Sequence, residues 1–338
     1  MPQLLDRQRL VALLAEGASR RVAIIGDAML DVYLRGDVDR ISPEAPVPVV
    51  RVRDRRYALG GAANVAQNVA ALGARGELVA TVGDDAAGHR VRQMLVDMGT
   101  EPRALVQVGR PTTTKTRLVA RAQQVVRFDE EDDSDLTGDD GERLLEAARR
   151  AISEADAVVL EDYNKGVLVP EIIEEVIRLA RSRGAPVVVD PKYRNFFAYR
   201  GATVFKPNRR ELESALGAAV DLDHPAALPQ TLDRLGVEHL LLTLGENGMA
   251  FISADGAVGR IPTTAREVYD VVGAGDTVTA YLAVMLAAGA SIREAAIVAN
   301  YAAGVEVGKL GAATVSPEEV LEAHDHFAES SSAQDDAA

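Results

Sequence analysis

The sequence predicts an α/β fold, in which helices flank a doubly wound, mostly parallel β-sheet and a small antiparallel β-sheet stands beside it. Short apolar runs rich in Val, Ile and Leu recur along the chain and end in Asp, Gly or Asn, as expected for strands buried on both faces. Stretches of helical length separate most of these runs. Two other segments alternate apolar and polar residues without an intervening helix, which is typical of antiparallel strands with one solvated face.

The central strands and helices can be placed one by one. The expected strands are RRVAIIGD, ELVATVGDD, DAVVLEDY, APVVVD, ATVFKPN and EHLLLTLG, in that order. The expected helices between them are 62–72, 86–98, 170–183 and 209–217. Sheets of this kind bind ligands beyond the carboxyl ends of their strands. We therefore expect a site among the polar residues at those ends: Asp27, Asp84, Asp162, Asp190, Asn208 and the segment after Leu242.

The two alternating segments, 46–58 and 103–129, are expected to form the small antiparallel sheet. A last helix follows Pro317, and the final residues, AESSSAQDDAA, are expected to be a frayed and disordered tail. With 338 residues, the chain is long enough for one large α/β domain.

The composition disfavours several classes of function. The chain has a formal net charge of −14 and no Lys/Arg cluster, which argues against a nucleic-acid partner. No apolar run reaches the roughly 18 residues that span a bilayer, so no membrane partner is expected. Cysteine is absent and the histidines lack HExxH spacing, which disfavours thiolate catalysis and a zinc site. Because the N-terminus is also unlike a signal peptide, we expect a cytoplasmic enzyme.

The segment DVVGAGDTV, residues 270–278, precedes a long alanine-rich apolar run and has two interpretations. It could be a loop whose Asp276 caps the following helix. Alternatively, small residues expose successive N–H groups at the positive end of a helix, and Asp276 stands beside this phosphate cradle to accept a proton from an attacking hydroxyl. A helix terminus contributes only about 0.3–1 kcal/mol, so we expect Asp276 to keep the basicity of an ordinary carboxylate.

Two further segments lie at expected strand ends. KPNRRE places Asn208 and Glu211 three residues apart, either as a helix N-cap with a capping box or as oxygen donors that hold Mg²⁺ through water. TLGENG, from Thr243 to Gly248, contains the Asn-Gly pair of a hairpin turn, and this turn is compatible with a binding role.

Near the N-terminus, GDAMLD places Asp27 and Asp31 four residues apart after the first strand, and GGAANVAQN opens a helix. Side chains such as Asp31 and Asn64 suit adjacent sugar hydroxyls, while Gly60 and Gly61 let a ligand approach the backbone closely. Gly-Gly before a helix is also an ordinary loop, so each segment alone is weak support for a site.

Together, these segments resemble the ribokinase-like carbohydrate kinases of the PfkB family from about residue 21 to 322. Both family signatures are present, GGAANVAQN near the start and DVVGAGDTV near the end. Within the family, the chain is most similar to the heptose 7-phosphate kinases of the ADP-heptose pathway, which feeds lipopolysaccharide core synthesis. The segments that carry this closer similarity are RISPEAPVPVVRV, QQVVRFDEE, EDYNKG, DPK and VGKLGAATVSPEE.

The resemblance implies a ribokinase-like domain over 1–322 with a β lid at about 33–59 and 103–130, followed by the helix end and tail at 323–338. It implies that Asp276 is the catalytic base and that the amides of Gly273, Ala274, Gly275 and Asp276 form the anion hole for the γ-phosphate of ATP. Asn208 and Glu211 match the family's Mg²⁺ motif. The expected nucleotide residues are Thr243, Gly245, Gly248 and Asn300. The expected sugar residues are Asp27, Asp31, Gly60, Gly61 and Asn64.

The implied reaction phosphorylates the anomeric hydroxyl of D-glycero-β-D-manno-heptose 7-phosphate. The expected residues of the substrate pocket include Asp162, and the candidate cations for the substrate phosphate are Lys165, Lys192, Arg117 and Arg194. Lys192 is favoured because it follows a buried strand on the ligand side of the sheet. The alternatives are a kinase for ribose, fructose phosphate or 2-keto-3-deoxygluconate, and a non-catalytic sensing module, which the intact GAGD segment disfavours. Relatives often dimerise through the lid, so a homodimer is expected.

The sequence departs from its family at two positions. Val272 stands where many relatives have Thr, and Glu161 replaces the small residue usual before Asp162 in the heptose kinases, which adds an anion near the expected substrate pocket. Heptose kinases are often fused to a nucleotidyltransferase with an HxGH motif. This motif is not present here, so the chain is expected to perform the kinase step alone.

Overall fold

A computed structural model of the chain describes residues 5–120, 123–222, 228–253, 256–265 and 267–335. Its centre is a nine-stranded sheet in the order β13-β12-β11-β10-β9-β8-β1-β4-β5. All pairs from β11 to β5 are parallel, whereas β12 and β13 are antiparallel. The strands are β1 (Arg21–Gly26), β4 (Arg75–Gly83), β5 (Leu105–Val108), β8 (Ala157–Glu161), β9 (Val187–Asp190), β10 (Val204–Phe205), β11 (His239–Thr243), β12 (Met249–Ser253) and β13 (Val258–Ile261).

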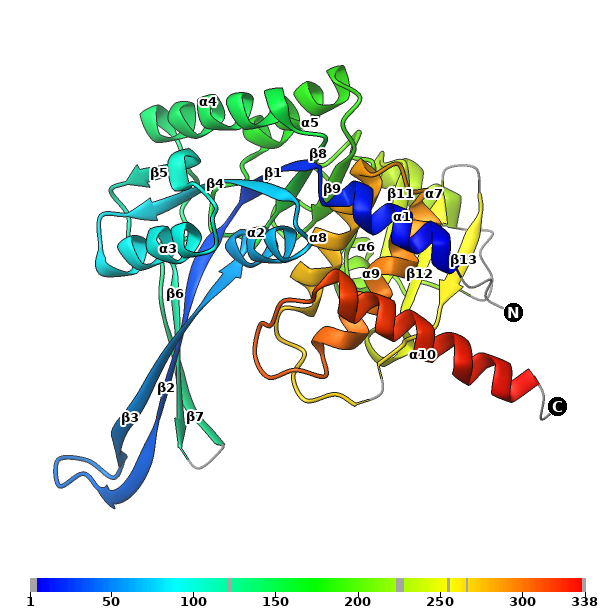
Figure 1. Cartoon of the computed structure of the whole chain (residues 1–338). Coiled ribbons are helices and arrows are strands. Elements are labelled where there is room, and N and C mark those ends of the chain that lie inside the picture. Colours follow the sequence, from blue (N-terminus) through cyan, green and yellow to red (C-terminus); the bar gives the residue numbers. More distant parts are fainter. Residues whose placement is uncertain (1–4, 121–122, 223–227, 254–255, 266, 336–338) are drawn as a thin grey trace.

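Helices cover both faces of this sheet (Figure 1). One layer contains α1 (Arg7–Gly17), α2 (Ala62–Ala71), α3 (Ala86–Asp97), α8 (Ala274–Ala287), α9 (Ile292–Glu306) and α10 (Pro317–Asp335). The other contains α4 (Gly138–Glu154), α5 (Pro170–Ser182), α6 (Arg209–Leu216) and α7 (Leu228–Leu235). Strand β1 shows why the apolar runs are continuous: Val22 and Ile24 pack on the first layer, while Ala23 and Ile25 pack on the second. The predicted doubly wound sheet is confirmed.

A second sheet of four strands, the lid, extends from the body as a long twisted ribbon (Figure 1). Its order is β3-β2-β6-β7, with antiparallel pairs at both edges and a parallel pair, β2 with β6, in the middle. Its strands are β2 (Ala28–Ile41), β3 (Pro48–Gly61), β6 (Thr114–Ala120) and β7 (Gln123–Glu130). The lid is rooted in the body because β2 begins two residues after β1 ends.

The structure differs from the expected lid at two places. The first lid strand, β2, begins at Ala28 rather than at about residue 33, so Asp31 lies on the lid. Residues 105–108, expected in the lid, form β5 of the main sheet and pair in parallel with β4. The reason is long-range pairing, because the backbone of β4 offers a free edge that a short apolar segment can complete.

The C-terminal segment is more regular than expected. Helix α10 runs to Asp335, so the residues expected to form a disordered tail are helical as far as that position. Parts of three predicted segments lie outside the described residues: 1–4, 223–227, 254–255 and 266 of the domain, 121–122 of the lid and 336–338 of the tail. Among the helices that the structure describes, none combines the length and the apolar character needed to cross a membrane.

Candidate active site

The GAGD segment lies at the start of α8. Gly273 is the N-cap and has a φ of 97°, a left-handed conformation that glycine adopts without strain. Ala274, Gly275 and Asp276 form the first turn, where backbone N–H groups have no acceptor within the helix. Residues 273–275 are partly exposed, whereas Asp276 is buried. The segment therefore presents amide donors and the positive end of a helix dipole, as the predicted anion hole requires.

Two side chains hold the carboxylate of Asp276. Asn64 Nδ2 donates a hydrogen bond of 2.8 Å to Oδ2, and the hydroxyl of Tyr163 donates one of 2.7 Å to Oδ1. Burial raises the pKa of Asp276 to about 6, against the lowering effect of these two donors, and nearby Asp190 also raises it. The predicted base is thus fixed in position and more basic than an ordinary aspartate.

The sugar residues predicted from the sequence meet where the lid joins the body. Asp31 on β2 lies against Gly60 on β3, where a Cβ atom would lie 2.7 Å from its Oδ2 atom. Gly61 has a φ of 58° and caps α2, and a Cβ there would lie 3.4 Å from the ring of Tyr163. Asn64 then stands in the first turn of α2. The lid base, the start of α2 and the start of α8 therefore adjoin one another through Tyr163 and Asn64.

Asp27 and Asp162 are buried among hydrogen bonds of the protein. The donors to Asp27 are the backbone N–H groups of Tyr163, Lys165 and Val167, at 2.7, 2.9 and 3.2 Å. Asp162 accepts hydrogen bonds from the Tyr199 hydroxyl and the Asn164 N–H, both at 2.7 Å. Burial raises the pKa of Asp27 to about 6. Both carboxylates shape the loop that carries Tyr163, and a direct contact of either with a sugar stays a prediction.

Each of the four candidate cations for a substrate phosphate has a carboxylate partner. The pairs are Lys165 with Glu131 at 2.8 Å, Lys192 with Glu211 at 2.6 Å, Arg117 with Asp31, and Arg194 with Asp133. Burial would lower the pKa of Lys192, but Asp190 and Glu211 raise it above its ordinary value. Lys192 therefore carries its charge at neutral pH. A phosphate that binds any of these groups competes with, or joins, an existing ion pair.

The segment KPNRRE was expected to form either a capping box or a pair of oxygen donors for Mg²⁺. Asn208 caps α6, and its side chain and that of Glu211 form a complete capping box. Asn208 also forms an isolated parallel bridge with Thr243, which brings the ends of β10 and β11 together. The carboxylate of Glu211 accepts from the Asn208 N–H and from Lys192. Each oxygen of Glu211 thus has one donor and can still accept a hydrogen bond from a water, so a Mg²⁺ held through water by Asn208 and Glu211 stays a prediction.

The predicted hairpin turn at TLGENG is confirmed, because β11 pairs antiparallel with β12 across it. Gly248 has a φ of 80°, and a Cβ there would lie 2.1 Å from the carbonyl oxygen of Ile261, so this position requires glycine. Gly245 is exposed at the tip, with a φ of 59°. Asn300 is buried in α9 and donates a hydrogen bond of 2.8 Å to the carbonyl of Pro262. Its side chain thereby holds the chain after β13 against α9.

The Val272 departure leaves the backbone of the anion hole supported. The N–H of Val272 donates a hydrogen bond of 3.1 Å to Oδ1 of Asp270. The missing threonine hydroxyl is therefore not needed to hold this residue in place.

Two neighbours of Asp276 were not predicted from the sequence. Tyr163 was quoted only as part of a motif, and Lys206 was not considered, although it is a lysine directly after a buried strand. Lys206 Nζ lies 2.8 Å from Oδ2 of Asp190 and is buried with it. Asp190 was expected at the carboxyl end of a strand, and it is the last residue of β9. Asp84, another strand-end residue, is exposed and has His89 as its ion-pair neighbour at 3.7 Å.

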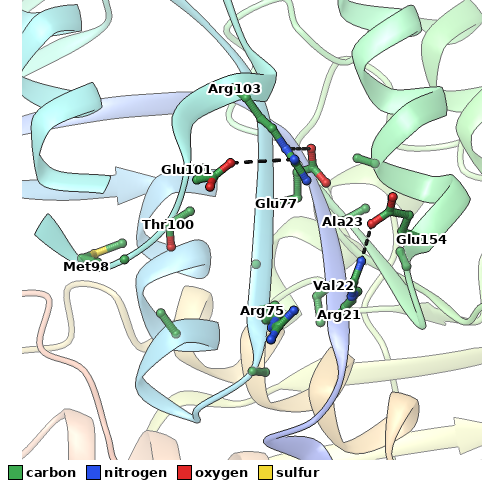
Figure 2. Close-up of a pocket in the computed structure, with 16 residues that line it drawn as sticks. Arg21, Val22, Ala23, Arg75, Glu77, Met98, Thr100, Glu101, Arg103 and Glu154 are labelled. Carbon is green, nitrogen blue, oxygen red and sulfur yellow. Dashed lines mark hydrogen bonds and ion pairs between the residues drawn. The ribbon is translucent and has the colours of Figure 1, made fainter. Parts of the chain in front are cut away.

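A pocket of about 410 Å³ lies at the opposite end of the sheet, near the amino ends of β1 and β4 (Figure 2). Five of its charged residues pair with one another: Arg21 with Glu154, and Arg103 with Glu77 and Glu101. No residue of the predicted site lines it. The candidate active site therefore remains at the carboxyl ends of the strands.

The fold defines the class of protein. The chain is similar to a putative ribokinase from Agrobacterium tumefaciens, with a TM-score of 0.73 and 24% identity over 92% of this chain and 99% of that one. It is also similar to phosphofructokinase-2 from Escherichia coli in its tetrameric inhibited form, with a TM-score of 0.75 and 20% identity over 92% and 99% of the two chains. These likenesses show a ribokinase-like fold.

The sequence gives the family: residues 19–319 match the pfkB family carbohydrate kinase model, and the chain belongs to that family. A relative from Rhodospirillum rubrum, named bifunctional protein HldE, is 45% identical over 93% of this chain and 64% of its own length. A protein of the same name from Paramagnetospirillum magneticum is 46% identical over 89% of this chain and 62% of its own. The chain thus spans a little under two thirds of these two relatives.

Proposed function

We propose that this chain is an ATP-dependent kinase that phosphorylates the anomeric hydroxyl of D-glycero-β-D-manno-heptose 7-phosphate and yields the 1,7-bisphosphate. The observation that carries the proposal is the position of Asp276. It is fixed by Asn64 and Tyr163 beside the amide donors of α8, so a phosphoryl group and an acceptor hydroxyl can meet there. The choice of heptose follows from the sequence segments shared with heptose 7-phosphate kinases and is supported by relatives named HldE.

The chemistry suits these groups. Phosphoryl transfer from ATP has a loose transition state with its charge spread over the phosphoryl oxygens, so catalysis depends mainly on positioning and electrostatic stabilisation. The amides of Gly273, Ala274, Gly275 and Asp276 donate to the γ-phosphate. Asp276 accepts the proton of the anomeric hydroxyl as the new P–O bond forms and the bond to ADP breaks.

Mg²⁺ would neutralise charge on the phosphates of ATP. Asn208 and Glu211 would hold it through water, because Mg²⁺ keeps much of its hydration shell and each of their side-chain oxygens can accept one more hydrogen bond. Thr243, Gly245, Gly248 and Asn300 would line the nucleotide site. Thr243 pairs with Asn208, while Gly248 and Asn300 both lie against Pro262, the residue after β13. ATP as the donor fits a cytoplasmic location.

Asp31, Gly60, Gly61 and Asn64 would bind the heptose hydroxyls. Lys165 and Lys192 would bind the 7-phosphate, with Arg117 and Arg194 as further candidates. The exposed edges of the lid support a homodimer in which two lids pair, because unpaired strand edges favour such contacts.

An ADP-release assay with Mg²⁺ and a panel of acceptors tests the proposal. The panel contains heptose 7-phosphate, ribose, fructose 6-phosphate, fructose 1-phosphate and 2-keto-3-deoxygluconate. We expect kcat/KM for heptose 7-phosphate to exceed every other value by at least about 100-fold, or roughly 3 kcal/mol of transition-state binding. If another acceptor in the panel has the highest kcat/KM, the chain is a sugar kinase with a different substrate. Binding of ATP or sugar without ADP release from any acceptor would instead indicate a sensing module.

A further inference from the structure

The carboxylate of Glu131 bridges two lysines from different parts of the molecule. Its Oε2 atom lies 3.5 Å from Nζ of Lys115 on lid strand β6, and its Oε1 atom lies 2.8 Å from Nζ of Lys165 in the loop after β8. Each oxygen of Glu131 therefore serves one ammonium group. Two oxygens of a phosphate group would bind the same pair of lysines in the same way.

The charges around Glu131 match a phosphate once its own carboxylate is removed. Lys115 also lies 3.1 Å from Asp129, whose second cation partner is Arg127 at 3.0 Å. The three cations and two carboxylates of this cluster give a net charge of +1, and removal of the Glu131 carboxylate makes it +2. A phosphate monoester carries close to −2 at neutral pH. A phosphate in place of Glu131 therefore neutralises the cluster.

The two lysines lie close to the candidate active site. Lys115 is the register partner of Asp31 in the β2–β6 pair, so both side chains project from the same face of the lid. Lys165 follows two residues after Tyr163, whose hydroxyl donates to the carboxylate of Asp276. The lysine pair is thus connected on the lid side to a predicted sugar residue and on the body side to the predicted base.

Another carboxylate that bridges two cations shows what is particular to Glu131. Glu175 lies 3.1 Å from Arg149 on α4 and 2.7 Å from Arg178 on α5, but these arginines are 47% and 62% exposed. Water solvates such cations, so they need no further anion. The side chains of Lys115 and Lys165 are each only 15% exposed, and two covered ammonium groups without an anion are costly. The lysine pair therefore requires an anion, which Glu131 supplies.

Glu131 can leave this position without disturbing the lid. It is the first residue after β7, its side chain is 27% exposed, and residues 131–137 form neither helix nor strand. Among the described residues, its side chain has hydrogen bonds only to the two lysines. Rotation of this side chain toward solvent therefore breaks no strand pairing.

We propose that Glu131 is an internal stand-in for the phosphate of the substrate, which displaces it and binds between Lys115 and Lys165. This inference rests on the proposed function. It assigns Lys115, which was not predicted from the sequence, as the second cation beside Lys165. An acceptor without an anionic group leaves Glu131 in place and gains nothing from the two lysines, so the exchange favours phosphorylated sugars.

Binding of inorganic phosphate to the full chain without nucleotide tests the exchange. Isothermal titration calorimetry near neutral pH compares wild type, Glu131→Gln, Glu175→Gln and the double variant Glu131→Gln/Lys115→Met. We expect Glu131→Gln to bind phosphate at least about tenfold more tightly than wild type, because it frees both lysines. Glu175→Gln is the matched control and should bind as wild type does. The double variant should lose the gain. An equal gain in Glu175→Gln, or a gain that survives Lys115→Met, would overturn the proposal.

The KM for heptose 7-phosphate in the ADP-release assay links the exchange to the substrate. At saturating ATP, Glu131→Gln should lower this KM and Lys115→Met should raise it, each by at least about fivefold, while kcat stays within about twofold of wild type. Tighter phosphate binding in Glu131→Gln without a fall in KM would also overturn the proposal, because the anion would then bind away from the substrate.

Failure of this inference and failure of the proposed function give different results. If wild type releases ADP with heptose 7-phosphate but Glu131→Gln changes neither phosphate affinity nor KM, the stand-in is refuted and the kinase proposal is unaffected. If wild type releases no ADP with any acceptor, the proposed function is wrong. The phosphate titration then still decides whether Glu131 occupies an anion site.

Discussion

Asp276 is a buried carboxylate at a helix N-terminus, and these two features act on its pKa in opposite directions. The helix terminus stabilises the ionised form by about 0.3–1 kcal/mol. Burial and Asp190 outweigh it, because the pKa rises from 3.8 to about 6, which corresponds to about 3 kcal/mol. The expectation from the sequence that Asp276 keeps an ordinary basicity is therefore wrong, since burial could not be inferred from the local motif.

The raised pKa predicts the pH dependence of catalysis. Asp276 must be ionised to accept a proton, and below its pKa it is increasingly protonated. We expect kcat/KM to be constant above about pH 6 and to fall about tenfold per pH unit below it, because this parameter reports the free enzyme. Steady-state rates between pH 4.5 and 8 measure the profile. If kcat/KM begins to fall only near pH 4, burial does not raise the pKa of Asp276.

Tyr163 is predicted to be a positioning residue that acts through Asp276. Its hydroxyl stabilises the ionised carboxylate, so Tyr163→Phe should move the acid limb of kcat/KM upward by about one pH unit. Tyr281→Phe is the control, because it also removes a buried hydroxyl, one that donates 3.0 Å to the carbonyl of Val315. A purely structural role for Tyr163 would leave the limb of both variants where it is in wild type.

At the scale of the elements, the start of α6 combines a capping box with the predicted Mg²⁺ position. Asn208→Ala removes the cap and should lower the free energy of unfolding by about 1 kcal/mol, whereas Asn208→Ser keeps a capping hydroxyl. We expect Asn208→Ser to retain stability in urea denaturation yet to raise the KM for Mg-ATP. If Asn208→Ser has the wild-type KM, the residue serves the helix alone.

The elements of the main sheet could be predicted because each depends mainly on the sequence of its own segment. A strand buried on both faces reads as a continuous apolar run, and the helices after 62, 86, 170 and 209 carry clear periodicity. The lid was less predictable. Strand β2 contains Asp31 and Gly36, and both residue types are uncommon in strands. Strand β5 forms because it pairs with β4, which its own sequence does not indicate.

The same distinction holds for the site. Asp276, Asn208 and Glu211 were predicted because each lies in a motif that is contiguous in the sequence. The contacts of Tyr163 with Asp276 and of Lys206 with Asp190 arise only when strands and helices far apart in the chain pack together. For the same reason, the ion pairs that occupy Lys165 and Lys192 could not be predicted.

At the scale of the whole molecule, the lid carries the predicted dimer contact. Within the described residues, its outer strands, β3 and β7, each have one unpaired edge, and β7 exposes Val125, Val126 and Phe128. We expect a dimer in size-exclusion chromatography with light scattering and a shift toward monomer in Val126→Lys. Val96→Lys on α3 is the control, since Val96 is 52% exposed and Val126 46%. Equal dimerisation of the two variants would place the interface away from β7.

The central claim is that Asp276 accepts the proton of the acceptor hydroxyl beside the amides of α8. The most direct test compares Asp276→Asn with wild type in ADP release with heptose 7-phosphate, after circular dichroism has shown that the variant is folded. We predict that turnover falls by at least about 100-fold while the Kd values for ATP and sugar stay within a few-fold of wild type. Wild-type turnover in the folded variant would contradict the account.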